Sequence, residues 1–328
     1  MGKHKPLKTG LALAIGVLLV GFGLAVGWFL FNSKNQESKY NLLDPSAGLG
    51  NSQQYIINFD PVRQQVKDYL NDLNTSYGLY FEYLPTGSNI RVDEDSVSVA
   101  ASLMKLPVVM DLYKLAEAGT INLEDTVMVE QGDVDADLEY GDPSGLSAGQ
   151  TISLRNAARL ALHNSDNTAI NIIKRVIKPL LTDETDAIQS LDIAYTLADD
   201  EYSAGPLQDK VLKINARSYG SILKCLYFAC FLNSADSQEI LSYLVGSVGT
   251  DRLSSAVPKN VQVAHKVGSA IKAQSDCGII YVPSQPYLLC LMFWDYQDPS
   301  GKETTAYFNK VSKMLYDYIS KTSTAPSP

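Results

Sequence analysis

The order of predicted helices and strands is the feature that most constrains the fold of this chain. Segments with the composition of strands stand near both ends of residues 56–322, and helical segments fill the middle. Strands are predicted at 78–83 and 89–92, and again at 261–270, 278–282 and 287–293. This order predicts an α+β fold of two lobes, in which an antiparallel sheet built from both ends of the chain carries an inserted all-α lobe. We expect a cleft between the two lobes.

The spacing of apolar residues places helices before, between and after these strands. Helices are predicted at about 60–73, 102–118, 154–162, 168–177, 216–232, 237–245 and 304–321. The N-terminal and C-terminal helices of this set are expected to flank the sheet. Two acidic stretches, 124–150 and 183–213, lack helical spacing. The second is longer than a simple connection requires, so we interpret it as a functional loop.

The N-terminus has the pattern of a membrane anchor. Residues 11–31 form a run of 21 apolar residues and glycines, which is long enough to span a hydrocarbon core of about 30 Å. Lysines before the run favour a cytoplasmic N-terminus, and no small-residue cleavage site follows it. We therefore expect a single-pass protein of the cell membrane with its folded domain outside. The predicted segments are a cytoplasmic terminus 1–9, a transmembrane signal anchor 10–31, an extracytoplasmic linker 32–55, the domain 56–322 and a tail 323–328.

Charge and composition exclude several kinds of partner. The net charge of −9, without a basic stripe in the sequence, argues against nucleic acid. The chain has three histidines, and its four cysteines lack metal-binding spacing, so we expect no metal and no other cofactor. Cys225 and Cys230 fall in one predicted apolar helix and are interpreted as buried thiols. Cys277 and Cys290 lie on neighbouring predicted strands, but their offset from the turn does not pair them directly, so a bridge is not favoured.

The first chemical motif is Ser102-Leu-Met-Lys105, at the start of a predicted apolar helix. Positions i and i+3 of a helix share one face, so the amine is expected beside the hydroxyl. A lysine with a lowered pKa can remove the proton of a serine and make it a nucleophile. Alone this pattern is common. It is followed in order by Ser165-Asp166-Asn167 and by Lys266-Val267-Gly268 on a predicted strand.

The three motifs in this order resemble those of class A serine β-lactamases and the related penicillin-binding proteins, namely Ser-x-x-Lys, Ser-Asp-Asn and Lys-Thr-Gly. The resemblance extends from about residue 60 to 320 and implies the same two-lobed fold. It implies that Ser102 attacks the carbonyl carbon of a β-lactam or a cell-wall peptide and forms an acyl-enzyme. Lys105 would take the proton of Ser102, and Ser165, helped by Lys266, would protonate the leaving nitrogen.

The resemblance also implies how a substrate is held. Asn167 would bind Lys105 and the substrate amide, and Lys266 would attract a substrate carboxylate. Backbone N–H groups of Ser102 and Ser269 would form an oxyanion hole. Gly268, from the third motif, and Tyr140, at the rim of the cleft, complete the predicted substrate-binding residues. We expect the domain to act as a monomer.

Two departures from the family pattern concern binding and hydrolysis. Val267 replaces a hydroxyl residue and cannot donate to a carboxylate, so binding is expected to be weaker or to depend on Ser269. Class A enzymes hydrolyse the acyl-enzyme with a glutamate in a loop after the second motif. Glu201, 36 residues after Ser165, stands at about that place, although Gly205 replaces the asparagine that follows in the family. Glu201 is therefore either the deacylation base or part of an acidic surface loop.

Three functions remain open from the sequence. The preferred one is a membrane-anchored serine β-lactamase. The second is a penicillin-binding or peptidase enzyme of the same fold, and the third is a non-catalytic envelope protein that binds a ligand. A Ser-His-Asp hydrolase is disfavoured because His163 and His265 have no Gly-x-Ser-x-Gly elbow beside them and no serine placed to pair with either. His163 is interpreted as a structural helix residue.

Overall fold

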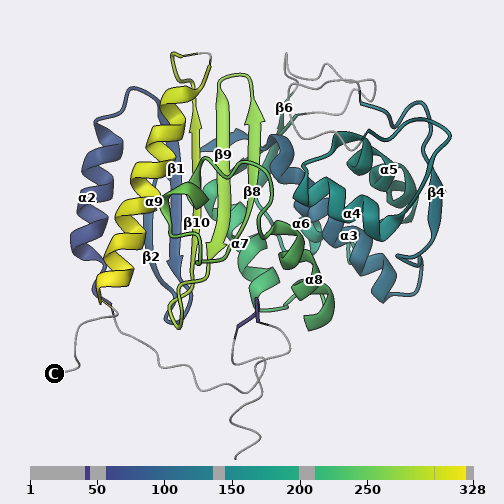
Figure 1. The fold of residues 1–328 in the computed structure, drawn as a ribbon, viewed down its shortest axis with the longest axis horizontal. Helices are drawn as coiled ribbons and strands as arrows, with labels where there is room; N and C mark the ends of the chain where they lie inside the picture. Colours follow the sequence, from purple (N-terminus) through teal and green to yellow (C-terminus); the bar gives the residue numbers. More distant parts are fainter. Residues whose placement is uncertain (1–40, 45–56, 136–144, 199–210, 299, 323–328) are drawn as a thin grey trace, which may run out of the picture.

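The computed structural model of the protein describes residues 41–44, 57–135, 145–198, 211–298 and 300–322. These residues form the two lobes that the sequence predicts (Figure 1). One lobe is a five-stranded sheet covered on its outer face by α2 (Asp60–Asn71) and α9 (Lys302–Thr322). The other lobe is helical. The predicted α+β architecture is therefore confirmed.

The main sheet joins the two ends of the described domain. Its order is β2-β1-β10-β9-β8, and every neighbouring pair is antiparallel. The strands are β1 (Ser76–Tyr83), β2 (Ser88–Val92), β8 (Val263–Ala270), β9 (Ala273–Ile280) and β10 (Tyr287–Trp294). The pairing of β1 with β10 brings the first hairpin beside the last strands, as predicted.

Both faces of this sheet are buried, and the composition of β10 reflects that position. Successive side chains of a strand point to opposite faces. Leu289, Leu291 and Phe293 pack in the layer formed with α2 and α9, whereas Leu288 and Met292 pack on the face toward the helical lobe. A strand buried on both faces needs apolar residues at every position, which explains the continuous run YLLCLMFW. The core of the sheet therefore lies in two layers.

The described part of the helical lobe includes four helices that pack against one another and a further helix that also packs on the sheet. They are α3 (Lys105–Glu117), α4 (Leu154–His163), α5 (Asn167–Ile177), α8 (Ser234–Leu244) and α7 (Ala216–Tyr227). Side chains cap several N-termini, because the first N–H groups of a helix have no partner within it. Ser153 caps α4, Asp166 caps α5, and Asn233 caps α8. These caps explain why the helices begin where they do.

The acidic stretch 183–213 contains more regular structure than the sequence predicted. It includes the short helix α6 (Ala187–Ser190) and two strands, β6 (Tyr195–Ala198) and β7 (Val211–Asn215). The two strands pair with each other, so that Ala198 is opposite Val211. β7 also pairs with β3 (Val97–Val99). The prediction of an irregular loop was wrong for these residues, because pairing to β3 supplies the backbone hydrogen bonds that favour strands.

The strand β9 begins five residues earlier than predicted. Its first half, which contains Gln274, Ser275 and Asp276, is polar and was assigned to a turn. These residues find polar partners within the fold, so they can be buried. The observed register places Cys277 directly opposite Cys290, and the two form a disulfide. The expectation that their offset prevents pairing was therefore wrong.

Cys225 and Cys230 also form a disulfide, which corrects their assignment as buried thiols. The helix α7 ends at Tyr227, earlier than the predicted end at residue 232. Ala229 then adopts a left-handed conformation with φ of 51°, which turns the chain back. The Cα atoms of Cys225 and Cys230 come within 5.1 Å, a normal separation for a bridge.

Residues Asn41–Asp44 pack against the domain, although they fall in the predicted linker 32–55. Leu42 and Leu43 are each 3% exposed and join the core that the helical lobe shares with the sheet. The backbone of this segment is also held, since Leu42 N donates to Gln238 Oε1 at 2.9 Å and Asp44 N donates to Tyr227 O at 3.0 Å. These four residues are therefore part of the folded unit, and for them the linker prediction was wrong.

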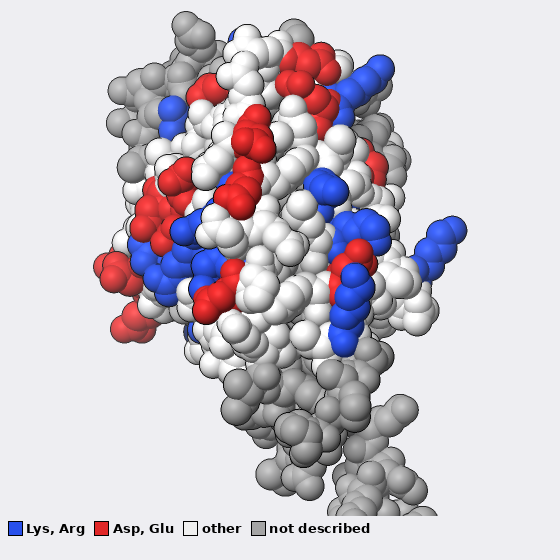
Figure 2. Space-filling model, turned by 90° about the vertical axis from the view of Figure 1, so that its left-hand side faces the viewer, with Lys and Arg blue, Asp and Glu red and all other residues white. Residues whose placement is uncertain are grey.

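The predicted transmembrane segment lies outside the described residues. Among the helices that are described, none is both long enough and apolar enough to cross a membrane. Figure 2 shows the side of the molecule that lies at the left in Figure 1, and here basic and acidic side chains are intermixed.

Candidate active site

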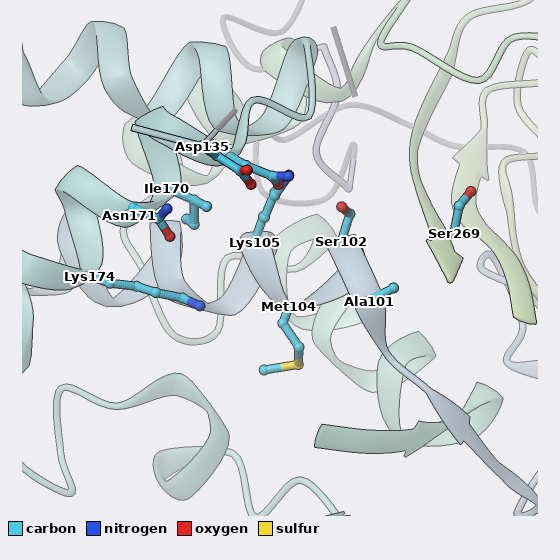
Figure 3. Close-up of a pocket in the computed structure, with 10 residues that line it drawn as sticks. Ala101, Ser102, Met104, Lys105, Asp135, Ile170, Asn171, Lys174 and Ser269 are labelled. Atoms are coloured by element: carbon cyan, nitrogen blue, oxygen red, sulfur yellow. The ribbon is translucent and has the colours of Figure 1, made fainter. Parts of the chain in front are cut away.

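A cleft of about 320 Å³ lies beside the start of α3. Its described lining residues are Ala101, Ser102, Met104, Lys105, Asp135, Asn167, Ile170, Asn171, Lys174 and Ser269. Ser102 lies on the 3-10 helix η2 (Ala101–Met104), which runs directly into α3. The side chains of Ser102 and Lys105 both project into the cleft (Figure 3). The i, i+3 placement predicted from the sequence therefore brings the hydroxyl and the amine to one cavity.

Lys105 is buried and is held by the second motif. Its Nζ donates to Asn167 Oδ1 at 2.6 Å, to Ser165 Oγ at 3.2 Å and to the carbonyl oxygen of Ser165. Only 5% of Lys105 is exposed, and burial lowers its pKa to about 7. The nearby charge of Asp166 opposes this shift, whereas Lys174 adds to it. The amine is therefore partly neutral at neutral pH and can accept a proton.

Ser165 is held in an uncommon backbone conformation that aims it at Lys105. Its φ is 56°, in the left-handed region, which is unfavourable for a residue with a Cβ. The next residue, Asp166, is fixed as the cap of α5, because its carboxylate accepts from Ala169 N at 2.6 Å. This cap holds the turn in place and directs both oxygens of Ser165 toward the lysine. Conformations of this kind are retained where the surrounding fold enforces them.

Lys266 completes the polar chain from the opposite side of the cleft. It lies on the edge strand β8, and its Nζ donates to Ser165 Oγ at 2.9 Å and to Val267 O at 3.0 Å. Lys266 is 0% exposed, and burial together with the charge of Lys105 lowers its pKa well below the usual value. One hydroxyl therefore accepts from two lysines, so Ser165 can exchange a proton with either amine.

Gly268 allows β8 to approach the turn that carries Ser102. A Cβ at this position would lie 2.9 Å from Ala100 O and 3.1 Å from Leu103 Cγ. Contacts this short would push β8 away from η2, so a glycine is required for the close approach. The glycine of the third motif thus has a packing role in addition to its predicted place in substrate binding. Val267, the next residue back, is 9% exposed and packs against Gly249.

Arg252 is a functional candidate that the sequence analysis missed. Its guanidinium donates to Ser269 Oγ at 2.7 Å, to Gly268 O at 3.0 Å and to Ser275 O at 2.8 Å. Only 7% of Arg252 is exposed, so its guanidinium is largely excluded from solvent. Its hydrogen bond holds the hydroxyl of Ser269 at the end of the cleft. No motif in the sequence marks this arginine, because its partners are mostly backbone carbonyls of distant strands.

A buried acid balances these cations. Asp276 is 0% exposed, and its carboxylate contacts His265 Nδ1 at 2.8 Å and accepts from Leu253 N at 3.0 Å. Its charge opposes the lowering of the pKa values of Lys266 and Arg252 that burial causes. Two buried cations beside one another are costly without such a countercharge. Asp276 therefore supports the positive end of the cleft from behind β8.

The remaining predicted site residues fall into two groups. Glu201 and Tyr140 lie outside the described residues, and their roles stay predictions. The segment with Glu201 follows β6 and precedes β7 in the chain. β7 lies close to the start of η2, because its Leu212 O accepts from the backbone N of Ala100 at 2.9 Å, and Ala100 is two residues before Ser102. His163 ends α4, and its Nδ1 lies 3.1 Å from Tyr243 O, on α8.

A two-lobed α+β fold with a serine and two lysines meeting in a cleft defines the class of β-lactamase-like serine hydrolases. A family model described as "Beta-lactamase enzyme family" matches residues 61–319. The protein therefore belongs to the β-lactamase enzyme family.

Individual relatives support this assignment at low identity. The chain is 24% identical over 291 residues to β-lactamase CARB-3 of Pseudomonas aeruginosa and 23% identical over 291 residues to β-lactamase PSE-4 of the same organism. Each match covers 85% of this chain and 96% of the relative. The solved structure of PBP-A shares the fold with a TM-score of 0.69 at 22% identity, over 80% of this chain and 97% of that one. The TLA-3 extended-spectrum β-lactamase gives a TM-score of 0.70 at 18% identity, over 80% and 99%.

Proposed function

We propose that this protein is a membrane-anchored serine β-lactamase of the class A type, which hydrolyses β-lactams through an acyl-enzyme on Ser102. The observation that carries the proposal is the buried amine of Lys105, whose pKa is lowered to about 7 within one helical turn of Ser102. A hydroxyl becomes an effective nucleophile when a base of suitable pKa lies nearby. Lys105 provides that base without a histidine or a metal.

Acylation would begin at Ser102. Its Oγ attacks the carbonyl carbon of the β-lactam ring, while its proton passes to Lys105 directly or through one water molecule. Backbone N–H groups of Ser102 and Ser269 stabilise the negative charge that develops on the carbonyl oxygen. The bond between the carbonyl carbon and the ring nitrogen then breaks. These steps leave an ester on Ser102 and a protonated Lys105.

The leaving nitrogen needs a proton, and the contacts of Ser165 support its role as the donor. Ser165 Oγ lies 3.2 Å from Lys105 Nζ and 2.9 Å from Lys266 Nζ. The hydroxyl gives its proton to the nitrogen and regains one from a lysine. Because Lys105 has just received the proton of Ser102, this route returns the amine to its neutral form. The net result is the transfer of one proton from Ser102 to the leaving nitrogen, by way of Lys105 and Ser165.

The substrate carboxylate would bind at the Ser269 end of the cleft. Ser269 Oγ accepts a hydrogen bond from Arg252, so its own proton is free to point toward an incoming anion. Arg252 adds a positive charge behind it, and Lys266 lies three residues earlier on the same strand. This arrangement supports the interpretation that Ser269 takes over the role of the hydroxyl that Val267 lacks.

Hydrolysis of the ester requires a base that activates water, and Glu201 is our candidate from the family resemblance. The segment that carries it follows β6 and precedes β7, and β7 is held beside Ala100 because Ala100 N donates to Leu212 O. A second function, a penicillin-binding or peptidase enzyme, is favoured by Val267 and by Gly205 in place of the family's asparagine. In that case the acyl-enzyme would persist when the acyl group comes from a penicillin.

Mass spectrometry of the intact full-length protein with benzylpenicillin separates these functions. A β-lactamase shows a transient adduct and accumulates hydrolysed penicillin, whereas a penicillin-binding enzyme shows an adduct that persists. The Ser102→Ala variant should form no adduct, and an adduct on this variant would overturn Ser102 as the nucleophile. Absence of both an adduct and hydrolysed penicillin with the unaltered protein would refute both enzymatic functions in favour of a binding protein.

The same assay tests the deacylation base. Glu201→Gln should accumulate the acyl-enzyme while its rate of formation stays close to that of the unaltered protein. Glu184→Gln is a matched control, since Glu184 is an exposed acid elsewhere on the helical lobe. Unchanged turnover in Glu201→Gln would remove this residue from the mechanism. The proposed anchor is tested separately, because deletion of residues 1–31 should release the domain from membranes in cell fractionation.

A further inference from the structure

One peptide group of the edge strand β8 supplies half of the proposed oxyanion hole. The N–H of Ser269 and the carbonyl of Gly268 belong to this group, and because it is trans the two point in opposite directions. The carbonyl oxygen of Gly268 points toward β9, since Arg252 Nη1 contacts both this oxygen and that of Ser275, which is opposite Gly268 on β9. The N–H of Ser269 therefore points toward the outer edge of the sheet, where Gly268 allows η2 and Ser102 to approach.

Arg252 fixes the plane of this peptide group. Its Nη1 donates to Gly268 O at 3.0 Å and to Ser275 O at 2.8 Å, and its Nη2 donates to Ser269 Oγ at 2.7 Å. The two nitrogens belong to one rigid, planar guanidinium. A rotation of the peptide would break the contact with Gly268 O and change the direction of the Ser269 N–H. The proposed oxyanion donor is thus held in position through its carbonyl side.

The charge of Arg252 also strengthens this donor. A hydrogen bond from a cation is stronger than one from a neutral group, and hydrogen bonds in a chain polarise one another. The bond that Gly268 O accepts therefore makes the N–H of Ser269 a better donor. Burial lowers the pKa of Arg252 and the charge of Asp276 opposes this shift, but a guanidinium stays protonated at neutral pH. With 7% of Arg252 exposed, little solvent screens its charge.

Arg252 is itself held from the side of the sheet that carries α9. The next residue, Leu253, donates its backbone N–H to Asp276 Oδ2 at 3.0 Å, which fixes the backbone beside the arginine. The guanidinium carbon of Arg252 lies 5.5 Å from the centre of the Phe308 ring, a distance at which a cation and an aromatic ring attract each other. Arg252 is not among the described residues that line the cleft, so it acts through the groups that it holds.

We propose that Arg252 is a positioning residue of the oxyanion hole, which orients and polarises the peptide group between Gly268 and Ser269. The inference rests on the proposed acylation of Ser102 and assigns a residue outside the three motifs to the chemical step. It differs from a role in binding a substrate carboxylate, which would act through the hydroxyl of Ser269. Because the negative oxygen forms in the transition state, loss of Arg252 should slow acylation more than it weakens substrate binding.

The test is made on the full-length protein in a Ser269→Ala background, which removes the hydroxyl and keeps the backbone N–H. One probe is phenylboronic acid, which carries no carboxylate and forms a tetrahedral anion with a serine hydroxyl, so that it mimics the transition state. Its dissociation constant is measured by calorimetry, and the acylation rate at saturating benzylpenicillin is measured by rapid quench and mass spectrometry. Loss of a whole oxyanion donor costs about 100-fold to 1,000-fold in rate. Arg252→Met leaves the donor but removes its support, so each quantity should worsen about tenfold.

Arg63→Met is a matched control, because Arg63 also donates to a backbone carbonyl of the sheet, that of Asn89 at 3.1 Å, on α2 and away from the cleft. It should leave both quantities unchanged. If Arg252→Met has no further effect in the Ser269→Ala background, the arginine acts through the hydroxyl alone and the inference is overturned.

Urea unfolding shows whether each variant is folded. If Arg252→Met is not, Arg252→Lys replaces it, with an expected loss of about threefold because one ammonium cannot reach all three acceptors. An affinity and a rate equal to those of the Ser269→Ala protein would again overturn the inference. If the unaltered protein neither binds phenylboronic acid nor is acylated by benzylpenicillin, the proposed function fails and this inference fails with it.

Discussion

The rate of acylation should depend on pH through the amine of Lys105. If neutral Lys105 removes the proton of Ser102, the rate follows the neutral fraction of this side chain. With a pKa of about 7, that fraction is about one half at pH 7, about one tenth at pH 6 and about one hundredth at pH 5. The rate should therefore rise about tenfold per pH unit below 7 and become constant above about pH 8.

The physical cause of the lowered pKa gives the prediction a second test. Burial is the largest cause, and among the nearby charges Lys174 lowers the pKa while Asp166 and Asp135 raise it. Lys174→Gln should therefore move the midpoint of the pH profile to higher pH, and Asp135→Asn should move it to lower pH. The assay is the single-turnover acylation rate with benzylpenicillin, measured by rapid quench and mass spectrometry between pH 5 and 9.

A rate that is constant from pH 5 to 8 would refute the role of Lys105 as base, and so would a midpoint near 10.5.

The pH dependence of stability offers an independent check on the lowered pKa of Lys105. Between about pH 7 and 10.5 the unfolded chain holds a proton on this lysine that the folded chain has lost, so stability should rise with pH across this range. Below pH 7 the buried charge costs up to about 5 kcal/mol, from a shift of about 3.5 units. Lys105→Met should therefore be relatively more stable at pH 6 than at pH 10 in urea unfolding.

Three further predictions concern the fold around the site. Gly268→Ala should slow acylation more than tenfold and lower the free energy of unfolding by about 1–3 kcal/mol, because the added Cβ would crowd Ala100 O. Acylation kinetics equal to those of the unaltered protein would contradict the packing argument. Leu43→Ala should cost about 2–4 kcal/mol in urea unfolding, as expected for a buried leucine, and a loss below about 0.5 kcal/mol would show that the segment is not docked. Mild reduction and alkylation of the native protein should label Cys230, which is exposed, and its partner Cys225. Cys277 and Cys290 are fully buried and should react only after unfolding. Equal labelling of both pairs would contradict this expectation.

The sequence predicted those parts of the fold in which local pattern and final environment agree. The capped helices of the helical lobe and the continuous apolar strand β10 have composition and period that match their burial. The three motifs were also informative, because their order along the chain is set by the elements that carry them. Their meeting in one cleft, with Ser165 between Lys105 and Lys266, follows the arrangement that the motif order implied.

The sequence failed where distant partners change the meaning of a local pattern. Ser275 and Asp276 have the composition of a turn, yet they lie in a buried strand because Arg252 and His265 satisfy them. That error moved the start of β9 and hid the pairing of Cys277 with Cys290. Arg252 itself was not recognised, since a single arginine outside a motif carries no sign of its contacts. The pairing of β7 with β3 likewise depends on residues more than a hundred positions apart.

The packing of Asn41–Asp44 against the folded domain has a consequence for the proposed membrane anchor. If residues 10–31 form the proposed anchor, nine residues separate it from the docked segment, and nine residues span at most about 30 Å when fully extended. The docked segment lies beside α8, whereas β6 lies at the opposite end of the molecule (Figure 1). With this anchor, the short connection would hold the end of the domain that carries the docked segment near the membrane. The end that carries β6 would then face away from the membrane, toward the medium from which substrates arrive.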